Sequence, residues 1–194
     1  MGCMQEIGNY KKKKTTLYKE RSEEKRKEYK ELIKDIPIEK LVYLDECGVE
    51  DSCCRVYERT SSGKKVHGDI SGKRADRVSV LAAYSQKQLL APARFEGYID
   101  SNVFNIWLKN FLLPTLKIGA TVILDNASIH KTLKTKELFK KAGCNFVCLP
   151  PYSPDLNKIE PQWANLKRKL RKLNKHTSSF LDSLDTCLLN MSIP

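Results

Sequence analysis

Two short apolar runs in this chain each end in an aspartate, and a helical pattern separates them. Residues 41–44 (Leu-Val-Tyr-Leu) lead into Asp45, and residues 121–124 (Thr-Val-Ile-Leu) lead into Asp125. Short apolar runs bounded by polar residues indicate buried strands. Strands that alternate with helices predict an α/β domain, because a sheet of this kind needs helices to cover its faces.

The remaining pattern adds strands and helices to the same domain. Further strands are expected over residues 77–84, 89–98 (broken at Pro92) and 145–149, and residues 55–60 are a candidate for another. Helices are expected over residues 103–116 with Ser101 as N-cap, over 131–142 with Gly143 as the stop, and from Glu160 to about Asn174. The order predicts a mixed five-stranded sheet flanked by helices, with an antiparallel meander first and parallel strands after it.

Residues 1–40 differ in composition from the rest of the chain. Four consecutive lysines occupy residues 11–14, and residues 20–34 mix charges with few apolar side chains. Glu23 and Lys27 stand one helical turn apart, a pairing that supports an exposed helix. We expect a basic arm and a linker helix over residues 1–40, followed by the folded domain over residues 41–194. A solvated linker that grips nothing is equally compatible with this pattern.

The charge of the chain points to a polyanionic partner. The net charge is +12 and the pI is near 9.3, which favours nucleic acid first and an anionic membrane surface second. A merely soluble basic surface is the alternative. No apolar stretch is long enough to span a membrane, and no apolar signal core follows Met1. Seven cysteines without a C-x-x-C pair argue against a zinc site and a disulfide framework, and favour a reducing cytosol.

Three carboxylates are candidates for one metal site. Asp45 and Asp125 would lie side by side at the carboxyl edge of the sheet if their strands are parallel neighbours. Glu160 precedes Pro161, which favours the first turn of a helix and pushes the residue before it out of helical angles, so Glu160 is expected at the cap. Carboxylates so close repel one another unless a cation joins them, and magnesium prefers carboxylate and water oxygens. Turn and helix-dipole roles would explain each acid taken singly.

Cationic side chains flank these acids in the sequence. The last predicted helix carries no acid between Pro161 and His176, and a glycine-rich basic stretch precedes the strand at residue 77. The candidates for gripping a phosphate backbone are Lys64, Lys65, Lys73, Arg74, Arg77, Lys167, Arg168, Arg171 and Lys172. For the glycine-rich stretch, a solvated loop is about equally compatible.

Three motifs, taken in order, resemble the DDE transposases of the mariner-like superfamily, closest to the bacterial insertion-sequence branch. They are residues 43–46 (Tyr-Leu-Asp-Glu), residues 123–130 (Ile-Leu-Asp-Asn-Ala-Ser-Ile-His) and residues 149–160 (Leu-Pro-Pro-Tyr-Ser-Pro-Asp-Leu-Asn-Lys-Ile-Glu). Thirty-four residues separate Asp125 from Glu160, the spacing that this branch shows. The resemblance covers about residues 40–175.

The resemblance implies an RNase H-like fold and a catalytic domain over residues 41–194. It implies two magnesium or manganese ions held by Asp45, Asp125 and Glu160, and cut-and-paste transposition. In that scheme the element end is cut, and its 3′-hydroxyl attacks target DNA, typically at a TA dinucleotide. Asn126 and His130 would position phosphate or water near the ions, or hold the structure by hydrogen bonds.

The implied partners are DNA (element ends and target), a second copy in a homodimer, and a separate helix-turn-helix half. The implied location is the cytoplasm, at the nucleoid. Glu46 is expected to point away from Asp45, because strand side chains alternate, and to have a supporting or structural role.

Two departures from the family pattern leave other functions open. Lys158 stands where the family commonly has proline, and residues 1–40 contain no helix-turn-helix pattern that would read element ends. One alternative is a ribonuclease H or junction resolvase with the same kind of site. Another is an inactive remnant that only binds DNA or dimerises.

Overall fold

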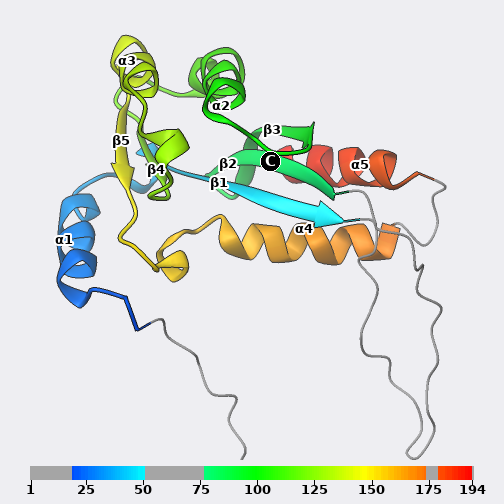
Figure 1. Ribbon diagram of the computed structural model, residues 1–194, viewed down its shortest axis with the longest axis horizontal. Coiled ribbons are helices and arrows are strands. Elements are labelled where there is room, and N and C mark those ends of the chain that lie inside the picture. The colour runs from blue at the N-terminus through cyan, green and yellow to red at the C-terminus, as the bar shows by residue number, and fades with distance from the viewer. Residues whose placement is uncertain (1–18, 51–76, 174–178, 194) are drawn as a thin grey trace, which may run out of the picture.

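The computed structural model describes residues 19–50, 77–173 and 179–193 (Figure 1). Its helices and strands are, in chain order, α1 (Glu23–Ile33), β1 (Leu41–Glu50), β2 (Arg77–Ser85), β3 (Gln88–Glu96), α2 (Ser101–Trp107), β4 (Thr121–Leu124), α3 (Leu133–Lys141), β5 (Asn145–Cys148), α4 (Glu160–Leu173) and α5 (Phe180–Ser192). Short turns of 3-10 or π-helix are η1 (Ile38–Lys40), η2 (Leu108–Leu112), η3 (Leu113–Thr115), η4 (Ser128–His130) and η5 (Pro154–Leu156). The candidate strand over residues 55–60 lies outside the described residues.

In the described part of the chain, five strands form one mixed sheet in the order β3-β2-β1-β4-β5. β1 pairs antiparallel with β2, and β2 pairs antiparallel with β3. β1 pairs parallel with β4, and β4 pairs parallel with β5. The meander followed by parallel strands is the arrangement predicted from the sequence. Tyr43 stands opposite Ile123 in the β1–β4 pair, so continuing this register by two residues brings Asp45 level with Asp125.

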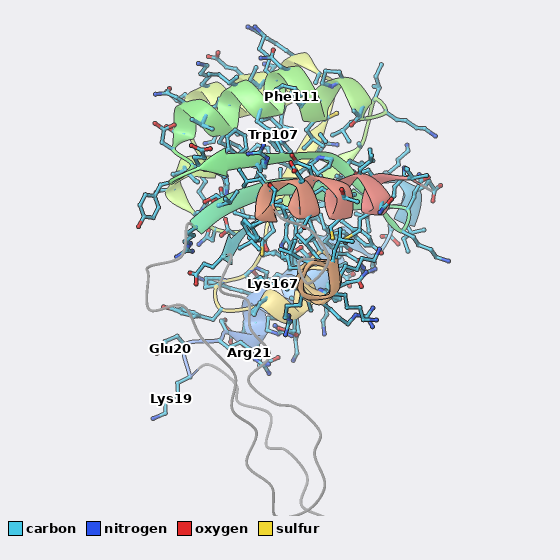
Figure 2. All side chains as sticks on the ribbon, turned by 90° about the vertical axis from the view of Figure 1, so that its right-hand side faces the viewer. Lys19, Glu20, Arg21, Trp107, Phe111 and Lys167 are labelled. Atoms are coloured by element: carbon cyan, nitrogen blue, oxygen red, sulfur yellow. The ribbon has the colours of Figure 1, made fainter. Side chains whose placement is uncertain are left out.

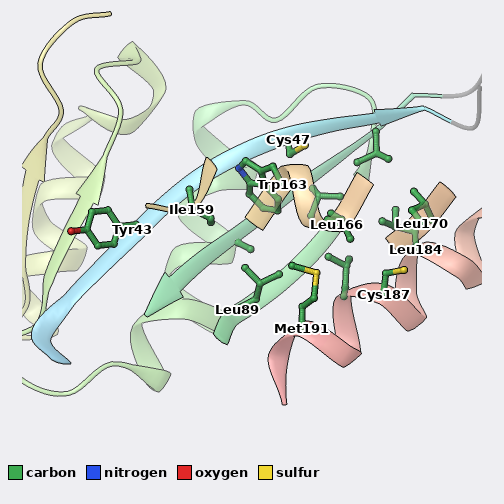
Figure 3. Close-up of a cluster of buried hydrophobic side chains, with 14 of the residues drawn as sticks. Tyr43, Cys47, Leu89, Ile159, Trp163, Leu166, Leu170, Leu184, Cys187 and Met191 are labelled. Carbon is green, nitrogen blue, oxygen red and sulfur yellow. The ribbon is translucent and has the colours of Figure 1, made fainter. Parts of the chain in front are cut away.

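Helices cover both faces of this sheet. α2 and α3 lie on one face, where Trp107 is buried between α2 and the strands and donates a hydrogen bond from Nε1 to the Ala91 carbonyl at 2.8 Å (Figure 2). α4 and α5 lie on the other face, over a buried apolar layer (Figure 3). The helical side chains of this second layer are Trp163, Leu166, Leu170, Leu184, Cys187, Leu188 and Met191.

The helix expected over residues 103–116 differs in its start and its end. Asp100, not Ser101, is the N-cap, because its carboxylate accepts hydrogen bonds from the amides of both Asn102 and Val103. The α-helical part ends at Trp107, and the chain continues through the wider turn η2 and the tighter turn η3. Pro114 lies in η3, where its missing N–H and its ring prevent an α-helix from continuing.

Two other sequence expectations concern proline and glycine. The break expected at Pro92 is wrong, because β3 runs through it from Gln88 to Glu96. β3 is an edge strand with an irregular register beside this proline, and an edge strand tolerates a residue without an N–H. Gly143 does stop α3: it follows Ala142 with φ +65, a left-handed angle that glycine adopts without strain.

The two ends of the described chain pack on the α4 side of the sheet. α5 had no counterpart among the predicted helices, and its apolar face closes the core against β3 and α4. α1 confirms the helix expected near residues 20–34, and its Tyr29 is only 5% exposed within the same core. Within the three described segments, no helix combines the length and apolar character that crossing a membrane requires.

A buried polar network joins α2 to α3 and offers a test of this packing. Thr135 donates a hydrogen bond from Oγ1 to Asn105 Oδ1 at 2.9 Å, and both residues are buried. We expect Thr135→Val to lower the free energy of unfolding by about 1–3 kcal/mol, because it leaves a buried amide oxygen without a donor. Urea unfolding measures the change. Thr186→Val, which removes an exposed hydroxyl on α5, should change it by less than about 0.5 kcal/mol, and equal losses in both variants would contradict the network's role.

Candidate active site

Asp45 lies in the middle of β1, not at its end as the sequence suggested. β1 continues to Glu50 because β2 still pairs with it after β4 has stopped. Alternation puts Asp45 on the same face as Tyr43 and Cys47, the face that α4 covers. There the Trp163 indole donates from Nε1 to Asp45 Oδ2 at 3.1 Å. This bond ties the carboxylate of β1 to α4.

Asp125 and Glu160 approach the same place from two other segments. Asp125 follows β4 directly, and its Oδ1 accepts a hydrogen bond from the Ala127 amide at 3.0 Å, so it also shapes the turn after the strand. Glu160 is the first residue of α4, one position inside the cap that was expected for it. Its amide donates to the Asn157 carbonyl at 3.2 Å, which links the start of α4 to the preceding proline-rich loop.

One cleft brings the three acids together. It has a volume of about 430 Å³. Asp45, Asp125 and Glu160 line it, together with Asn126, Ala127, Leu149, Pro150, Pro151, Tyr152, Ser153, Pro154 and Asn157. Among the residues that the structure describes, no group of three His, Cys, Asp or Glu side chains is already arranged to hold a single metal ion. The acids therefore share an open cleft and not a closed cage.

The electrostatics of the cleft disfavour several negative charges at once. Burial raises the pKa of Asp45 to about 6, hydrogen bonds from the backbone of Glu46 and from Trp163 oppose the rise, and the charges of Glu160 and Asp125 add to it. Burial also raises the pKa of Glu46 to about 7, with further contributions from Asp125 and Asp45. A positive ion in the cleft would relieve this repulsion.

Glu46 and His130 lie close to Asp125 on the side away from Asp45. Glu46 points to the opposite face from Asp45, as predicted, yet its Oε1 lies 3.8 Å from His130 Nε2. His130 Nε2 is also 3.3 Å from Asp125 Oδ1, and the buried imidazole packs on the Phe104 ring at a centroid distance of 4.3 Å. Burial lowers the pKa of His130 despite the nearby Asp125 charge, so the imidazole is neutral at pH 7. His130 therefore contacts Asp125 directly.

Asn126 has a more peripheral position. Its side chain is exposed, it lines the cleft, and its Oδ1 accepts a hydrogen bond from Lys131 Nζ. Its side chain is therefore accessible to a ligand that binds in the cleft. Its role beside the acids stays a prediction.

The predicted DNA contacts divide into three groups. Lys64, Lys65, Lys73 and Arg74 lie outside the described residues. Arg77 begins β2, and its guanidinium lies over Gly48, so close that a Cβ added there would be 2.7 Å from an Arg77 nitrogen. The third group lies on α4, which begins in the cleft at Glu160: Lys167, Arg168, Arg171 and Lys172.

The α4 cations differ in their exposure. Lys167 is half-buried near Cys47, and its charge opposes the rise that burial causes in the pKa of the thiol. Arg168 and Lys172 are exposed. Gly48 follows Cys47 in the same strand, so Arg77 lies on the sheet face opposite the one that Lys167 approaches. The structure thus does not join the described cations into one patch.

Two contacts at the cleft had no signal in the local sequence. Trp163 is buried on α4, and its bond to Asp45 spans 118 residues. Arg26 of α1 forms a two-pronged pair with Asp155 in the loop before α4, across 129 residues. Only the tertiary fold brings such partners together.

The fold matches solved structures of a mariner transposase. The Mos1 strand transfer complex aligns with a TM-score of 0.66 at 14% identity, over 97% of this chain and 68% of that chain. The catalytic domain of Mos1 mariner transposase aligns with a TM-score of 0.55 at 11% identity, over 91% of this chain and 96% of that one. Identities this low speak for the fold alone, and they confirm the RNase H-like architecture that was predicted.

Sequence relatives come from nematodes. The transposable element Tc3 transposase of Caenorhabditis elegans is 31% identical over 126 residues, which is 63% of this chain and 38% of the relative. The transposable element Tcb1 transposase of Caenorhabditis briggsae is 29% identical over 98 residues, which is 48% of this chain and 36% of the relative. The chain spans little more than a third of the length of these relatives.

Most of the chain also matches a protein family model. The DDE superfamily endonuclease model matches residues 40–184, a range that contains both strands of the parallel β1–β4 pair, all three cleft acids and the whole of α4. The matched range covers most of the chain and coincides with the sheet and the helices that build the cleft. The chain belongs to the DDE superfamily endonucleases.

Proposed function

We propose that this chain is the catalytic part of a cut-and-paste transposase. It would cut a DNA strand at the end of a mobile element and join the freed 3′-hydroxyl to target DNA. The observation that carries the proposal is the convergence of Asp45, Asp125 and Glu160, from three separate elements, on one cleft. Their order and spacing match the family motifs, and the family model spans all three.

The donor set of the cleft fits divalent cations that prefer oxygen. All three candidate ligands are carboxylates, and burial with mutual repulsion makes a full set of negative charges costly without a cation. Magnesium is commonly held by one or two carboxylates, with water and substrate phosphate completing its shell. An open cleft is therefore the geometry expected before DNA arrives. The related Mos1 paired-end complexes were solved with Mn and with Mg, which supports the same ions here, and we propose two of them.

The residues of the chain would divide the work as follows. Asp45, oriented by Trp163, and Asp125, oriented by its turn, would hold one side of the metal site, and Glu160 would close the other. Such ions, when bound, activate the attacking oxygen and stabilise the leaving one during phosphodiester cleavage. The neutral His130 imidazole would contact Asp125 and hold it in place, and Glu46 would lie beside the same imidazole nitrogen. The proline-rich wall of the cleft would exclude bulk water beside the scissile phosphate.

Phosphate contacts outside the cleft would come from α4. Glu160 begins the helix, and the described part of α4 carries no acid after it. Its exposed cations Arg168 and Lys172 would meet the DNA backbone near the cut, a contact that positions the duplex without reading its sequence. Arg77, on the other face of the sheet, would contact a separate stretch of DNA or a second copy of the chain.

The proposed partners follow from this function. They are element-end DNA, target DNA, a second copy in a homodimer, and a separate helix-turn-helix half that reads the element ends. The solved Mos1 paired-end complex with the left transposon end contains such DNA. The nematode relatives are far longer than the matched region, so their remaining length is available for end recognition.

The catalytic assignment is tested by replacing Asp125 with Asn. Asparagine can still accept the hydrogen bond from the Ala127 amide, but it removes the negative charge that would hold the ion. We expect nicking of plasmid DNA with Mg²⁺ to fall by more than about a hundredfold, while DNA binding in Ca²⁺ persists. Glu137→Ala, an exposed acid on α3, should leave nicking unchanged. Full nicking by Asp125→Asn would end the assignment.

The same assay distinguishes the alternatives. Cleavage of RNA–DNA hybrids or four-way junctions without strand joining would favour a ribonuclease H or resolvase. Metal-independent DNA binding with no cleavage in the wild type would favour the inactive remnant. A strand-transfer product that depends on Asp125 would exclude both.

The repulsion in the cleft predicts how stability depends on pH. The folded-state pKa of Asp45, about 6, lies above its ordinary value of 3.8, so the metal-free protein loses stability as the pH rises through this interval. We expect Asp45→Asn to raise the free energy of unfolding by about 3 kcal/mol at pH 8 and by almost nothing below pH 4. Urea unfolding in EDTA measures this, with exposed Asp35→Asn as control. Equal stability of wild type and Asp45→Asn at pH 8 would contradict the buried charge.

The contribution of α4 to DNA binding is tested through salt. Each phosphate contact that is lost lowers the slope of log affinity against log salt concentration by about 0.9. We therefore expect the double variant Arg168→Gln, Lys172→Gln to lower the slope by about 1.8, measured by fluorescence anisotropy with short duplex DNA. The matched control replaces two exposed lysines of the other helical layer, Lys109 and Lys140, with Gln. A slope that falls equally in both double variants would argue against a specific path along α4.

A further inference from the structure

A loop of nine residues separates two buried anchors beside the cleft. Leu149, just after β5, is 6% exposed, and Ile159, just before α4, is fully buried. Most residues between them line the cleft, and the next residue after Ile159 is the candidate ligand Glu160. The shape of this loop therefore sets where the Glu160 carboxylate enters the cleft.

One residue of the loop adopts a backbone conformation that is unfavourable on its own. Tyr152 adopts φ 53, a left-handed angle that is unfavourable for any residue with a Cβ. Such a conformation persists only where the surrounding structure fixes it. At its C-terminal end the loop is fixed by Ile159 and by Lys158, whose Nζ lies 5.5 Å from the centre of the Tyr43 ring. A contact from outside the loop gives its middle further support.

Arg26 of α1 supplies that support. Its Nη1 donates to Asp155 Oδ1 at 2.9 Å, and its Nη2 donates to Asp155 Oδ2 at 2.6 Å. Two parallel bonds of this kind fix direction as well as distance. The Arg26 side chain is only 7% exposed, so its charge depends on this partner, since a buried guanidinium without one is costly. Asp155 itself is 56% exposed, so the pair joins a buried guanidinium to a carboxylate at the surface.

A short series of turns connects this restraint to Glu160, the candidate metal ligand. Asp155 lies in η5, where the Asn157 amide donates to the Pro154 carbonyl at 2.9 Å. The Glu160 amide then donates to the Asn157 carbonyl at 3.2 Å. Asp155 thus lies in a turn that two consecutive backbone bonds join to the first turn of α4.

α1 is itself fixed to the domain. Ser22 caps it by accepting a bond from the Lys25 amide, and Tyr29 inserts into the core that α4 and α5 share with the sheet. Glu23 holds the other side of the Arg26 guanidinium at 3.8 Å. The guanidinium is therefore presented from a helix whose first turn is capped and whose Tyr29 ring is buried in the core.

We propose that Arg26 is a positioning residue of the active site, which fixes the 150–160 loop through Asp155 and thereby places Glu160 for metal binding. This inference rests on the proposed function, because Glu160 matters only if the cleft binds cations. It assigns α1, which lies outside the matched family region, a direct part in building the site. Arg26 does not touch DNA or the ions in this role.

The first measurement follows the loop without reference to metal or DNA. Hydrogen exchange on the full chain reports on the amides of Leu156, Asn157 and Glu160, each of which is bonded within the loop. We expect Arg26→Gln and Asp155→Asn each to speed their exchange by about tenfold. The matched control is Arg94→Gln, which breaks a single 2.8 Å ion pair between β3 and α5, and it should leave these amides unchanged. Unchanged exchange in Arg26→Gln would overturn the proposal.

The second measurement asks whether the loop matters to the metal site. Isothermal titration with Mn²⁺ alone should show a dissociation constant at least about threefold higher in Arg26→Gln and Asp155→Asn than in wild type or Arg94→Gln. The exchanged pair, Arg26→Asp with Asp155→Arg, should recover part of both losses, which separates the specific contact from general destabilisation. Faster exchange with unchanged Mn²⁺ affinity would make the pair structural only and would overturn the positioning role.

The failure of the proposed function has a different signature. Mn²⁺ binding that is identical in wild type and Asp125→Asn would remove the metal site, and with it both the proposed function and the positioning role. Loss of Mn²⁺ binding in Asp125→Asn, together with normal binding in Arg26→Gln, would remove only the positioning role.

Discussion

The parallel pairing of β1 with β4 is the constraint on which the site depends. Parallel neighbours point the same way, so residues that follow each strand collect at one edge of the sheet. The register that sets Tyr43 opposite Ile123 brings Asp45 level with Asp125. A shift of this register by one residue would send Asp45 to the other face of the sheet. β1 is also held by β2, which pairs with it over eight residues from Tyr43 to Glu50.

The cleft that results is unfavourable for the protein in the absence of a cation. Asp45 and Glu46 are both held above their ordinary pKa values by burial, with Asp125 close to each. Groups perturbed in this way concentrate at functional sites. A cation would convert the repulsion into attraction, and an incoming phosphodiester would complete the shell that the open cleft leaves incomplete. This is the physical link between the fold, the family and the proposed chemistry.

The third acid reaches the cleft by a different route from the first two. Strand pairing fixes the aspartates, whereas Glu160 depends on a proline-rich loop whose two ends are buried and whose middle is tied to α1. Trp163, one turn further along α4, binds Asp45 and so fixes the helix against the strand. The site is thus held by the sheet on one side and by two long-range side-chain contacts on the other.

Local sequence signals predicted most of the fold and the identity of the acids. Apolar runs marked β1, β2, β4 and β5, and Gly143 marked the end of α3, because burial and backbone angles are properties of a few neighbouring residues. The same reasoning misplaced the N-cap of α2, extended that helix past Pro114 to residue 116, and broke β3 at Pro92. The N-cap of α2 depended on which of two adjacent side chains, Asp100 or Ser101, could accept bonds from the helix amides. The continuity of β3 depended on its position at the edge of the sheet.

The order of strands and acids, the strongly basic helix and the family of this chain were determined by sequence alone, since each is written in residue type and spacing. Only the tertiary structure decided that Asp45 lies inside a strand that β2 prolongs. It alone placed His130 and Glu46 behind Asp125, and it alone paired Arg26 with Asp155. Contacts across more than a hundred residues depend on how whole layers pack, and no local pattern records that packing.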